Sequence, residues 1–355
     1  MHQNYLLEIN VGSLCNFRCR YCFENGDNHL YTPTEITHDI INNFARYSRW
    51  LYYTKCKGDN LHLLFYGGEP MAQYDKIKYA IERTKGVFCS YTIITNGSFT
   101  EQYKDQILRL RESIKPATLS FASSYDFTMQ NEMRGDNTYN MVRDSIRWLY
   151  KNGMCHKCIT VFSMRNFHRI DEIFFDFVEL HKECPTLRLA FNIDRYGNIP
   201  EDFDDTHIVK ALQRVKDYID INPEIKPYFT FNTDPSEHKA MCSFPLCFYA
   251  SILGGMTHNG NVYPSYEFEA TAPSEEVRKM LYLGNISEDF GSIERRRQEV
   301  LDALNQYSHP KECVNCNVPC RGHPWAFFNG DWSSWYSIPS KGYCRIQKLI
   351  WEYLQ

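Results

Sequence analysis

The sequence lacks the long apolar runs that would place a chain in or across a membrane. No stretch stays apolar over the roughly 20 residues that a transmembrane helix needs. The start, MHQNYLLEIN, lacks the basic segment and apolar run of a secretory signal peptide. Lys and Arg are scattered through a chain of formal net charge −4, whereas phosphate recognition needs a concentrated basic surface. We therefore predict a cytoplasmic protein that binds neither nucleic acid nor membranes.

Internal repeats and low-complexity tracts are missing as well. The chain has 355 residues, of which 43% are hydrophobic, and this suits one large domain with an appendage. Among its 14 cysteines, three lie close together near the start and four lie between 313 and 344. A disulfide framework is not expected in the cytoplasm. Cysteines grouped in this way indicate metal ligands instead.

Strand-like and helical segments alternate through the first two-thirds of the chain. We expect strands at 5–11, 61–65, 91–95, 117–122, 157–162 and 187–192, and helices at 34–53, 73–85, 101–114, 139–151, 170–182 and 206–219. This order predicts about six βαβ units with parallel strands. Such units curl into a full or partial barrel of the α/β class, with ligand sites at the carboxyl ends of the strands.

The pattern changes near Asn222. The run from there to Pro245 is rich in Pro, Asn, Asp and Ser, and the residues that follow contain few periodic segments. Six of the cysteines lie in this last part of the chain. We therefore predict a barrel domain at 1–225 and a small, metal-stapled domain at 226–355.

The strongest chemical signal is a CxxxCxxC motif made by Cys15, Cys19 and Cys22, directly after the first predicted strand. Three thiolates suit three irons of a four-iron cluster and leave the fourth iron open. An open coordination site on a metal is where a substrate or cofactor binds. A structural zinc site is the competing interpretation, but such sites prefer four closed ligands and paired CxxC spacing.

The motif, with an aromatic residue before its last cysteine, resembles the radical S-adenosylmethionine superfamily, and other landmarks of that family follow in order over roughly 5–220. The resemblance implies a partial (β/α)6 TIM-type barrel, a 4Fe-4S cluster and bound S-adenosylmethionine, which is cleaved to a 5′-deoxyadenosyl radical. The cofactor-binding residues that it implies are Tyr21, Gly67, Gly68, Glu69, Pro70, Thr95, Asn96, Ser120 and Arg134.

A second set of cysteines, Cys313, Cys316, Cys320 and Cys344, forms a complete metal ligand set. From the spacing alone, structural zinc and an iron–sulfur cluster are both open. The segment resembles the auxiliary-cluster extension called SPASM, or Twitch in its shorter form, which implies an auxiliary iron–sulfur cluster, expected to be 4Fe-4S. The sequence departs from the family pattern, because only three residues follow Cys316 before the next cysteine and His323 stands where another is expected.

A further departure lies upstream, where Ser265 replaces the cysteine of the family's glycine-to-cysteine segment. A second auxiliary cluster is therefore not expected. Cys242 and Cys247 are either remnants of its ligands, additional ligands of the remaining cluster, or cysteines packed beside it. Cys247 is also a candidate hydrogen-atom donor to a product radical.

The resemblance favours a radical enzyme that modifies a peptide or protein by crosslinking, oxidation or epimerisation, with a reductant such as flavodoxin or ferredoxin. Alternatives are a small-molecule substrate such as a nucleotide or amino acid, and formylglycine formation as in anaerobic sulfatase maturation. For the latter, the family carries an acidic residue where Tyr266 stands, and Glu267 comes one position later. A non-catalytic iron–sulfur protein would not need the GGEP and TNG landmarks. Because the first predicted strand begins at residue 5, we expect no leader-peptide-binding domain before it.

Candidates for a catalytic acid or base are Glu267, Asp194 and Asp126, each near a strand end or the tail, but we expect each of them to be a solvated surface carboxylate. Cys155 and Cys158 mimic a metal-binding pair. Residues three apart on a strand face opposite sides, so we expect no metal there.

Overall fold

The chain folds around a single sheet in the order β10-β9-β8-β1-β2-β3-β4-β5-β6-β7. The computed structural model describes residues 3–24, 33–194, 199–231, 252–272, 274–305 and 341–354. The strands in this part of the chain are β1 (Asn4–Asn10), β2 (Asn60–Tyr66), β3 (Ser90–Thr95), β4 (Thr118–Ser124), β5 (Cys155–Phe162), β6 (Arg188–Ile193), β7 (Phe229–Phe231), β8 (Ile252–Met256), β9 (Asn261–Tyr263) and β10 (Gly284–Asn285).

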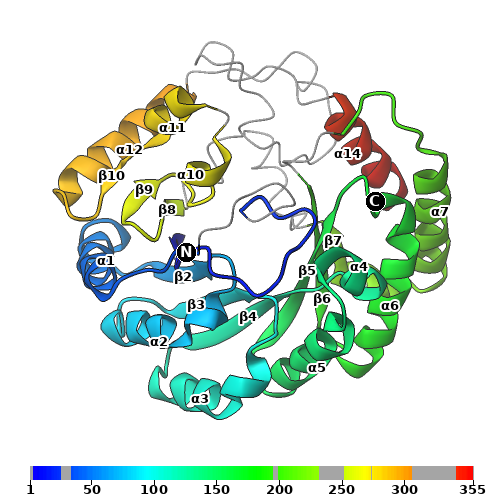
Figure 1. Cartoon of the computed structure of the whole chain (residues 1–355), viewed down its shortest axis with the longest axis horizontal. Helices are drawn as coiled ribbons and strands as arrows, with labels where there is room; N and C mark the ends of the chain where they lie inside the picture. Colours follow the sequence, from blue (N-terminus) through cyan, green and yellow to red (C-terminus); the bar gives the residue numbers. More distant parts are fainter. Residues whose placement is uncertain are drawn as a thin grey trace.

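Helices connect these strands and cover the outer side of the sheet (Figure 1). The α-helices are α1 (His38–Leu51), α2 (Tyr74–Arg83), α3 (Thr100–Ser113), α4 (Gln130–Arg134), α5 (Thr138–Lys151), α6 (Ile170–Glu183), α7 (Thr206–Ile221), α10 (Phe268–Thr271), α11 (Glu275–Leu281), α12 (Phe290–Asn305) and α14 (Lys341–Leu354). Short turns of 3₁₀-helix lie at Pro70–Gln73, Phe127–Met129, Phe167–Arg169 and Pro223–Tyr228, and one π-helical turn lies at Tyr52–Cys56.

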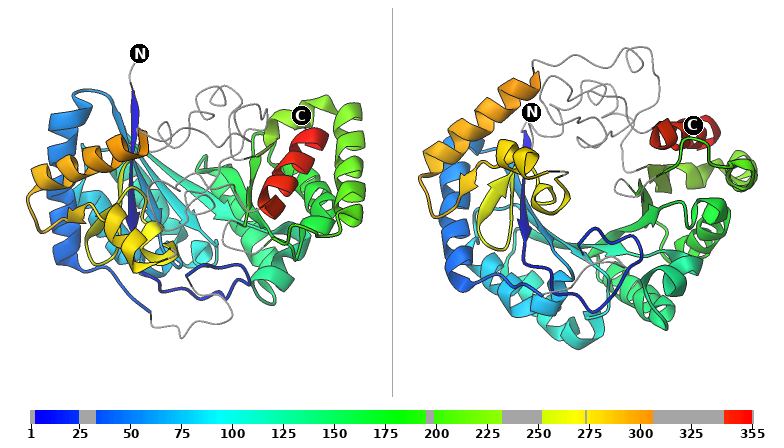
Figure 2. Two further views of the ribbon diagram at one scale, coloured as in Figure 1. Left: turned by 90° about the horizontal axis from the view of Figure 1, so that it is seen from above. Right: turned by 45° about the horizontal axis from the view of Figure 1, so that its top comes forward.

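The sheet curves into an unclosed barrel. Every neighbouring pair from β8 through β1 to β7 is parallel, whereas β9 and β10 run antiparallel to their neighbours. Two views show the strands as an arc with the helices outside it, and no described strand bridges from β7 to β10 (Figures 1 and 2). The predicted α/β class and the partial barrel are therefore confirmed.

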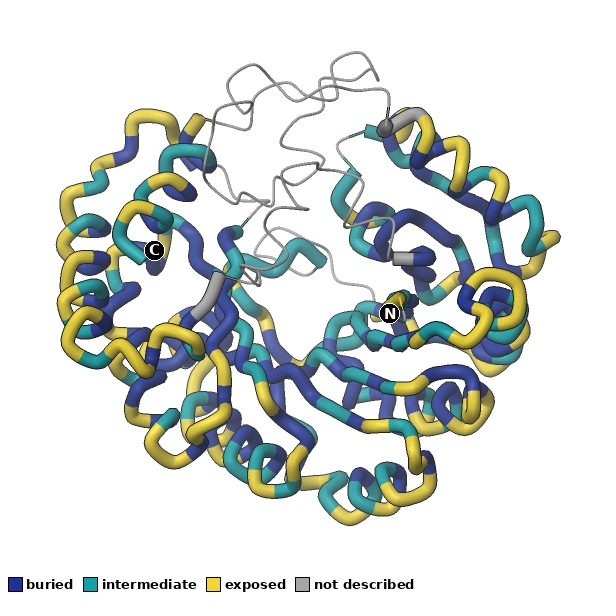
Figure 3. The backbone as a smooth tube through the Cα atoms, turned by 180° about the vertical axis from the view of Figure 1, so that it is seen from behind, coloured by how far each residue is buried: buried dark blue, intermediate teal, exposed yellow. Residues whose placement is uncertain are grey.

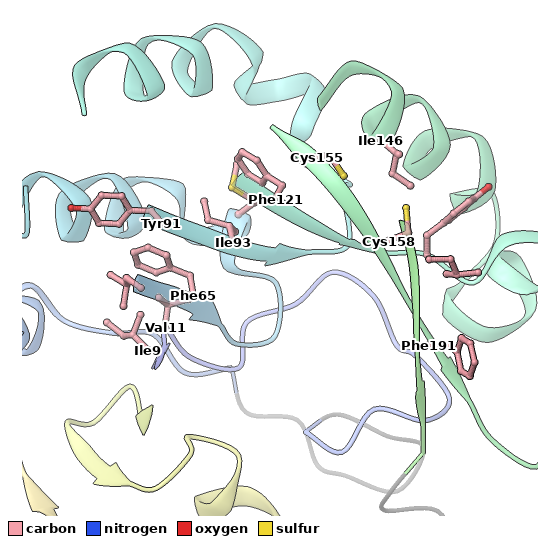
Figure 4. Packing of buried hydrophobic residues seen from close by; sticks show 14 of the residues in the cluster. Ile9, Val11, Phe65, Tyr91, Ile93, Phe121, Ile146, Cys155, Cys158 and Phe191 are labelled. Carbon is pink, nitrogen blue, oxygen red and sulfur yellow. The ribbon is translucent and has the colours of Figure 1, made fainter. Parts of the chain in front are cut away.

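The core lies between the strands and the outer helices. Ile9, Phe65, Ile93 and Phe121 are register partners on β1 to β4, and each is at most 3% exposed. Figure 4 shows this row of side chains, and Figure 3 shows the same division as buried strands inside helices with exposed outer faces. Burying each such side chain stabilises the fold by roughly 1.5–3 kcal/mol.

The opposite face of the same strands lines the barrel interior, because successive side chains alternate across a strand. One interior row consists of Glu8, Leu64, Thr92 and Ser120, which are register partners on β1 to β4. A carboxylate thus stands on the inner wall of the barrel, one residue away from the apolar row in Figure 4. The carboxyl ends of these strands all point to one edge, where the loops that follow them gather.

The last part of the chain contains more regular structure than its sequence predicted. The helices α12 and α14 have 16 and 14 residues, and β8 pairs with β1 over the register partners Leu6 to Ile9. β8 to β10 therefore extend the barrel sheet itself. The division at residue 225 stays a prediction. No helix in the described ranges is long and apolar enough to cross a membrane.

Candidate functional site

The loop that carries Cys15, Cys19 and Cys22 follows β1 at the carboxyl edge of the sheet, and all three thiols are half-buried. It is anchored to the end of β2, where Gly68 N donates to Gly12 O (2.8 Å) and Glu69 N to Leu14 O (2.7 Å). The approach is close, since a Cβ at Gly68 would lie 2.3 Å from a backbone oxygen of the loop. The double glycine is therefore needed for the loop to sit against β2.

Burial raises the pKa of the Cys15 thiol to about 12 and that of Cys19 to about 11. Both thiols are therefore protonated at neutral pH until a metal displaces the protons. Among the described residues, no group of three His, Cys, Asp or Glu side chains is placed to hold a single metal ion. Three cysteines on one short loop suit a four-iron cluster better, because each thiolate then binds a different iron. The donor set fits the cluster that the sequence predicted.

Glu69 is a buried acidic group beside the loop, at 1% exposure. Its Oε1 accepts hydrogen bonds from Thr95 Oγ1 (2.6 Å) and Met71 N (2.9 Å), and its Oε2 accepts one from Asn96 N (2.6 Å). Burial raises the pKa of this carboxyl to about 7, although the three donors oppose the shift. The network joins the ends of β2 and β3 and holds a carboxylate that can receive a cationic group.

Asn96 connects the end of β3 to the cysteine loop. Its Nδ2 donates to Asn16 Oδ1 (3.0 Å) and lies 4.0 Å from Cys15 Sγ. Asn16 in turn donates to Ser98 Oγ (3.0 Å). The structure thus brings the predicted residues of the GGEP and TNG segments together around Cys15, as expected for strands that end at one edge.

Tyr21 and Arg134 meet on the other side of the loop through Asp126, which is fully buried. Tyr21 Oη donates to Asp126 Oδ2, and Arg134 Nε donates to the same oxygen (2.8 Å). Thr160 Oγ1 donates to Asp126 Oδ1 (2.8 Å), and Arg134 Nη1 lies 3.9 Å from Cys19 Sγ. Asp126 is therefore a buried anchor. The expectation of a solvated carboxylate was wrong at this position, because Tyr21, Thr160 and Arg134 converge on it.

Ser120 lies deeper in the barrel than the other predicted cofactor residues. It is the register partner of Thr92, whose Oγ1 lies 2.9 Å from Ser120 Oγ. The register partner of Thr95 is Ser123, three residues further along β4. The hydroxyl of Ser120 thus faces the interior row below the edge where Glu69 and Asn96 gather, and its role in cofactor binding stays a prediction.

A third buried carboxylate, Glu8 on β1, was missed by the sequence interpretation. It is 3% exposed, and its Oε2 accepts hydrogen bonds from Ser265 Oγ (2.8 Å) and Tyr266 N (3.4 Å). Burial raises the pKa of Glu8 to about 8, and the charge of Glu267 adds to the shift. The sequence signal was an acidic residue on the interior side of a strand whose other face is apolar.

The residues around Glu8 belong to the segment that follows β9. Ser265 is buried and bonded to Glu8, and the ring of Tyr266 stacks on Tyr66 at the end of β2, with centroids 4.3 Å apart. A Cβ at Gly255 on β8 would lie 1.9 Å from Tyr266 N, so this glycine lets the segment pack onto the strand. Ser265 thus presents a hydroxyl that donates a hydrogen bond to a buried carboxyl.

Only some of the remaining predicted residues lie within the described ranges. Cys344 lies in the first turn of α14 and is half-buried, and Asp194 follows β6, where its N donates to Phe162 O (2.6 Å). Pro70 begins a 3₁₀ turn beside Glu69. Outside the described residues lie Cys242, Cys247, Cys313, Cys316, Cys320 and His323.

Comparison with known proteins agrees with this site. The model of the radical SAM superfamily matches residues 9–177. The radical SAM cyclopropyl synthase TigE of Paramaledivibacter caminithermalis is 20% identical over 160 residues, 40% of this chain and 31% of that protein. The S-adenosylmethionine-dependent nucleotide dehydratase of a Fibrobacter species is 24% identical over 170 residues, 46% and 50% of the two chains. The chain thus matches a third to a half of the length of these curated relatives.

Solved structures extend the likeness to nearly the whole fold. Native anSMEcpe with bound AdoMet superposes with a TM-score of 0.68 at 16% identity, covering 98% of this chain and 96% of that one. The same protein with AdoMet and the Cp18Cys peptide gives 0.64 over the same shares. At this identity the likeness concerns the fold, and it agrees with the unclosed barrel in Figure 2.

Proposed function

Because residues 9–177 form a radical SAM superfamily domain, we propose that this enzyme cleaves S-adenosylmethionine and abstracts a hydrogen atom from a peptide or protein. The observation that carries the proposal is the loop of Cys15, Cys19 and Cys22, held at the carboxyl edge of the barrel between two buried carboxylate networks. The radical SAM family implies a 4Fe-4S cluster and S-adenosylmethionine, and the donor set fits both.

The bound cluster would supply the electron that breaks the sulfur–C5′ bond of S-adenosylmethionine, giving the radical that takes hydrogen from the substrate. Glu69 would accept hydrogen bonds from the ammonium group of the cofactor, since its carboxylate is already oriented by Thr95 and Asn96. Asn96 and Tyr21 keep the two sides of the loop in place.

A peptide or protein substrate is favoured by one fold neighbour, which binds a peptide together with AdoMet. We propose that residues 226–355 form a SPASM- or Twitch-like domain in which Cys313, Cys316, Cys320 and Cys344 bind an auxiliary iron–sulfur cluster. Such a cluster would accept the electron released in a crosslink or an oxidation, including formylglycine formation. Epimerisation would need a hydrogen-atom donor instead, for which Cys247 is the candidate. A flavodoxin or ferredoxin would supply electrons in the cytoplasm.

A small-molecule substrate is the second candidate. It is favoured by the 24% identity to a nucleotide dehydratase over 170 residues. The interior row of the barrel contains Glu8, Thr92 and Ser120, and these polar groups suit a polar small molecule as well as a peptide. The peptide proposal and the small-molecule proposal therefore differ in the class of substrate that binds inside the barrel.

The test is the production of 5′-deoxyadenosine by anaerobically reconstituted, reduced enzyme. The rate is compared without substrate, with the peptide fraction of a source-cell extract and with its small-molecule fraction. Stimulation by peptides is expected, and stimulation by small molecules alone would replace the leading proposal with the second. The variants Cys15→Ala, Cys19→Ala and Cys22→Ala are expected to reduce cleavage to background. A variant that still cleaves the cofactor would contradict the cluster assignment.

The auxiliary site is tested by iron counting. Cys313→Ala with Cys316→Ala is expected to lose one cluster's worth of iron and to keep the S-adenosylmethionine-responsive cluster. The matched control is Cys89→Ala, which removes an exposed cysteine far from both motifs in the sequence. Unchanged iron in the double variant would exclude the assignment.

A further inference from the structure

A buried cation, Arg134, lies beside the cluster loop at Cys19. Arg134 ends α4 and is 6% exposed, and its Nη1 lies 3.9 Å from Cys19 Sγ, within the range of an N–H···S hydrogen bond. Its Nε is bonded to Asp126 (2.8 Å). The guanidinium also lies over the ring of Tyr21, 5.3 Å from its centroid. Three contacts thus fix the direction in which the charge of Arg134 points.

The loop is built so that this contact persists. Arg20 N donates to Met133 O (2.9 Å), which ties the loop backbone to α4 one residue before Arg134. The Asp126 side chain is held in place, because it also accepts hydrogen bonds from Thr160 Oγ1 and from Val161 N on β5. The cation is therefore positioned by β4, β5 and α4 together, and its place beside Cys19 does not depend on a flexible side chain.

We propose that Arg134 is a positioning residue that raises the reduction potential of the cluster to which Cys19 belongs, an inference that rests on the proposed function. Reduction adds one electron to the cluster and its thiolates, and no bond breaks and no proton moves in this step. The reductant is the flavodoxin- or ferredoxin-type donor of the proposed function. A cation in contact with a ligand sulfur stabilises the added charge, because it acts through the poorly screened protein interior. Hydrogen bonds to cluster sulfurs act in the same direction.

Asp126 carries the charge opposite to that of Arg134, so replacing each residue in turn tests the direction in which the reduction potential of the cluster changes. Its carboxylate is bonded to the guanidinium, and only the guanidinium contacts the sulfur. Removing the cation is expected to lower the potential, whereas removing the anion leaves an uncompensated cation and is expected to raise it. A merely structural anchor would give changes of one direction in both variants, because each loosens the same loop.

The experiment is a redox titration of the reconstituted full-length enzyme, followed by electron paramagnetic resonance. The signal that changes when S-adenosylmethionine is added identifies the cluster of Cys15, Cys19 and Cys22. Arg134→Gln is expected to lower the reduced-to-oxidised ratio at a fixed solution potential about tenfold, equivalent to about 59 mV for one electron. Asp126→Asn is expected to raise it, and Arg134→Lys, which keeps the charge, to lie between Arg134→Gln and the wild type.

Arg20→Gln is the matched control. Arg20 is the residue after Cys19, but its side chain is 45% exposed and pairs with Glu132 (3.9 Å), so solvent screens its charge. Arg20→Gln should change the reduced-to-oxidised ratio of the cluster at a fixed solution potential by less than about twofold. Equal midpoints for Arg134→Gln and the wild type would overturn the inference, as would shifts of the same sign in Arg134→Gln and Asp126→Asn. If Arg134→Gln binds no cluster, Arg134→Lys and Asp126→Asn decide by their signs. A wild type without a cofactor-responsive cluster would refute the proposed function instead.

Discussion

Two buried carboxylates, Glu69 and Glu8, stand on neighbouring walls of the same barrel and differ in what surrounds them. Glu69 follows β2 at the carboxyl edge and accepts three hydrogen bonds of 2.6 to 2.9 Å. Glu8 faces the interior from the middle of β1 and accepts two, from Ser265 at 2.8 Å and Tyr266 at 3.4 Å. Both side chains are at most 3% exposed, so burial is similar and the donors differ.

The protonation of the two groups follows this difference. Burial raises the pKa of both, to about 7 for Glu69 and to about 8 for Glu8, where the neighbouring charge of Glu267 adds to the effect. Each hydrogen bond to an ionised carboxylate favours the charged form. Near neutral pH, Glu69 is therefore readily ionised and suited to a cationic cofactor group, whereas Glu8 holds its proton more firmly.

The comparison separates a carboxylate whose donors lie at strand ends from one whose donors lie in the segment after β9. The donors of Glu69 come from the ends of β2 and β3, so they are present wherever the strands end together. The donors of Glu8 come from the segment that follows β9. These hydrogen bonds therefore tie β1 to that segment.

The largest effect is expected from Glu69→Gln. The amide keeps the shape but loses the charge, and one of its positions turns from an acceptor into a donor that faces donors. A charge-assisted hydrogen bond contributes about 1.5–3 kcal/mol, so S-adenosylmethionine should bind roughly ten- to a hundredfold more weakly. Isothermal titration of the reconstituted enzyme with S-adenosylmethionine measures this.

The control for this prediction is Glu132→Gln. Glu132 lies on α4 beside the same loop, but its side chain is 47% exposed, and its ion pairs within the described ranges are with Arg20 and Arg169. Its affinity for S-adenosylmethionine should stay within about twofold of the wild type. If Glu69→Gln also stays within twofold, the distinction drawn between the two carboxylates is wrong.

A pH-dependent effect on the stability of the fold, instead of on cofactor binding, is expected from Glu8→Gln. The pKa of Glu8 rises from 4.5 to about 8 in the folded state, so the folded chain binds more protons than the unfolded chain between these values. Its contribution to stability is fully present below pH 4.5 and is lost as the pH rises through about 8. Gln cannot ionise, and the variant should gain stability relative to the wild type as the pH rises from 5 to 8.

Chemical denaturation at pH 5, 6, 7 and 8 measures this difference. The free energy of unfolding of Glu8→Gln minus that of the wild type should increase by at most about 1.4 kcal/mol per pH unit. Glu132→Gln serves as the exposed control and should run parallel to the wild type. A difference that is constant with pH would mean that Glu8 is ionised throughout, and the contrast with Glu69 would disappear.

The sequence predicted the βα alternation up to α7 and the fold class, because the apolar rows of β1 to β6 repeat at the spacing of strands. It also predicted that Cys15, Glu69 and Asn96 meet, since residues at strand ends share one edge. It did not predict that Asp126 is buried, because burial of a carboxylate depends on partners such as Arg134 that only the fold brings together. It did not predict β8 either, because the two glycines of this strand interrupt the apolar pattern that marks a strand in the sequence.

Cys155 and Cys158 illustrate a second limit. Their spacing predicted opposite faces of β5, but both are fully buried in the apolar cluster that Figure 4 draws. The register between β4 and β5 shifts after Phe121, whose partner is Cys155, while the partner of Ala122 is Lys157. The extra residue in β5 shifts the alternation of side chains by one position after the bulge. Cys155 and Cys158 therefore lie on the same face of the strand. A bulge of this kind has no signature in the sequence here.

The smallest effect is expected from Thr95→Val, which makes Glu69 more like Glu8. Val keeps the shape and burial but removes the donor at 2.6 Å from Glu69 Oε1, as well as the acceptor for Gly97 N (3.0 Å). Loss of a donor disfavours the ionised carboxylate, so the pKa of Glu69 should rise toward that of Glu8. At about 1 kcal/mol for one hydrogen bond, binding of S-adenosylmethionine should weaken about fivefold at pH 7 and recover as the pH rises to 8.5.

Titrations of S-adenosylmethionine binding at the two pH values measure this effect. The control is Thr92→Val, because Thr92 is bonded to Ser120 in the interior row and not to Glu69. Equal weakening at both pH values would show that Thr95 acts through shape alone and that the donors do not set the difference between the two carboxylates.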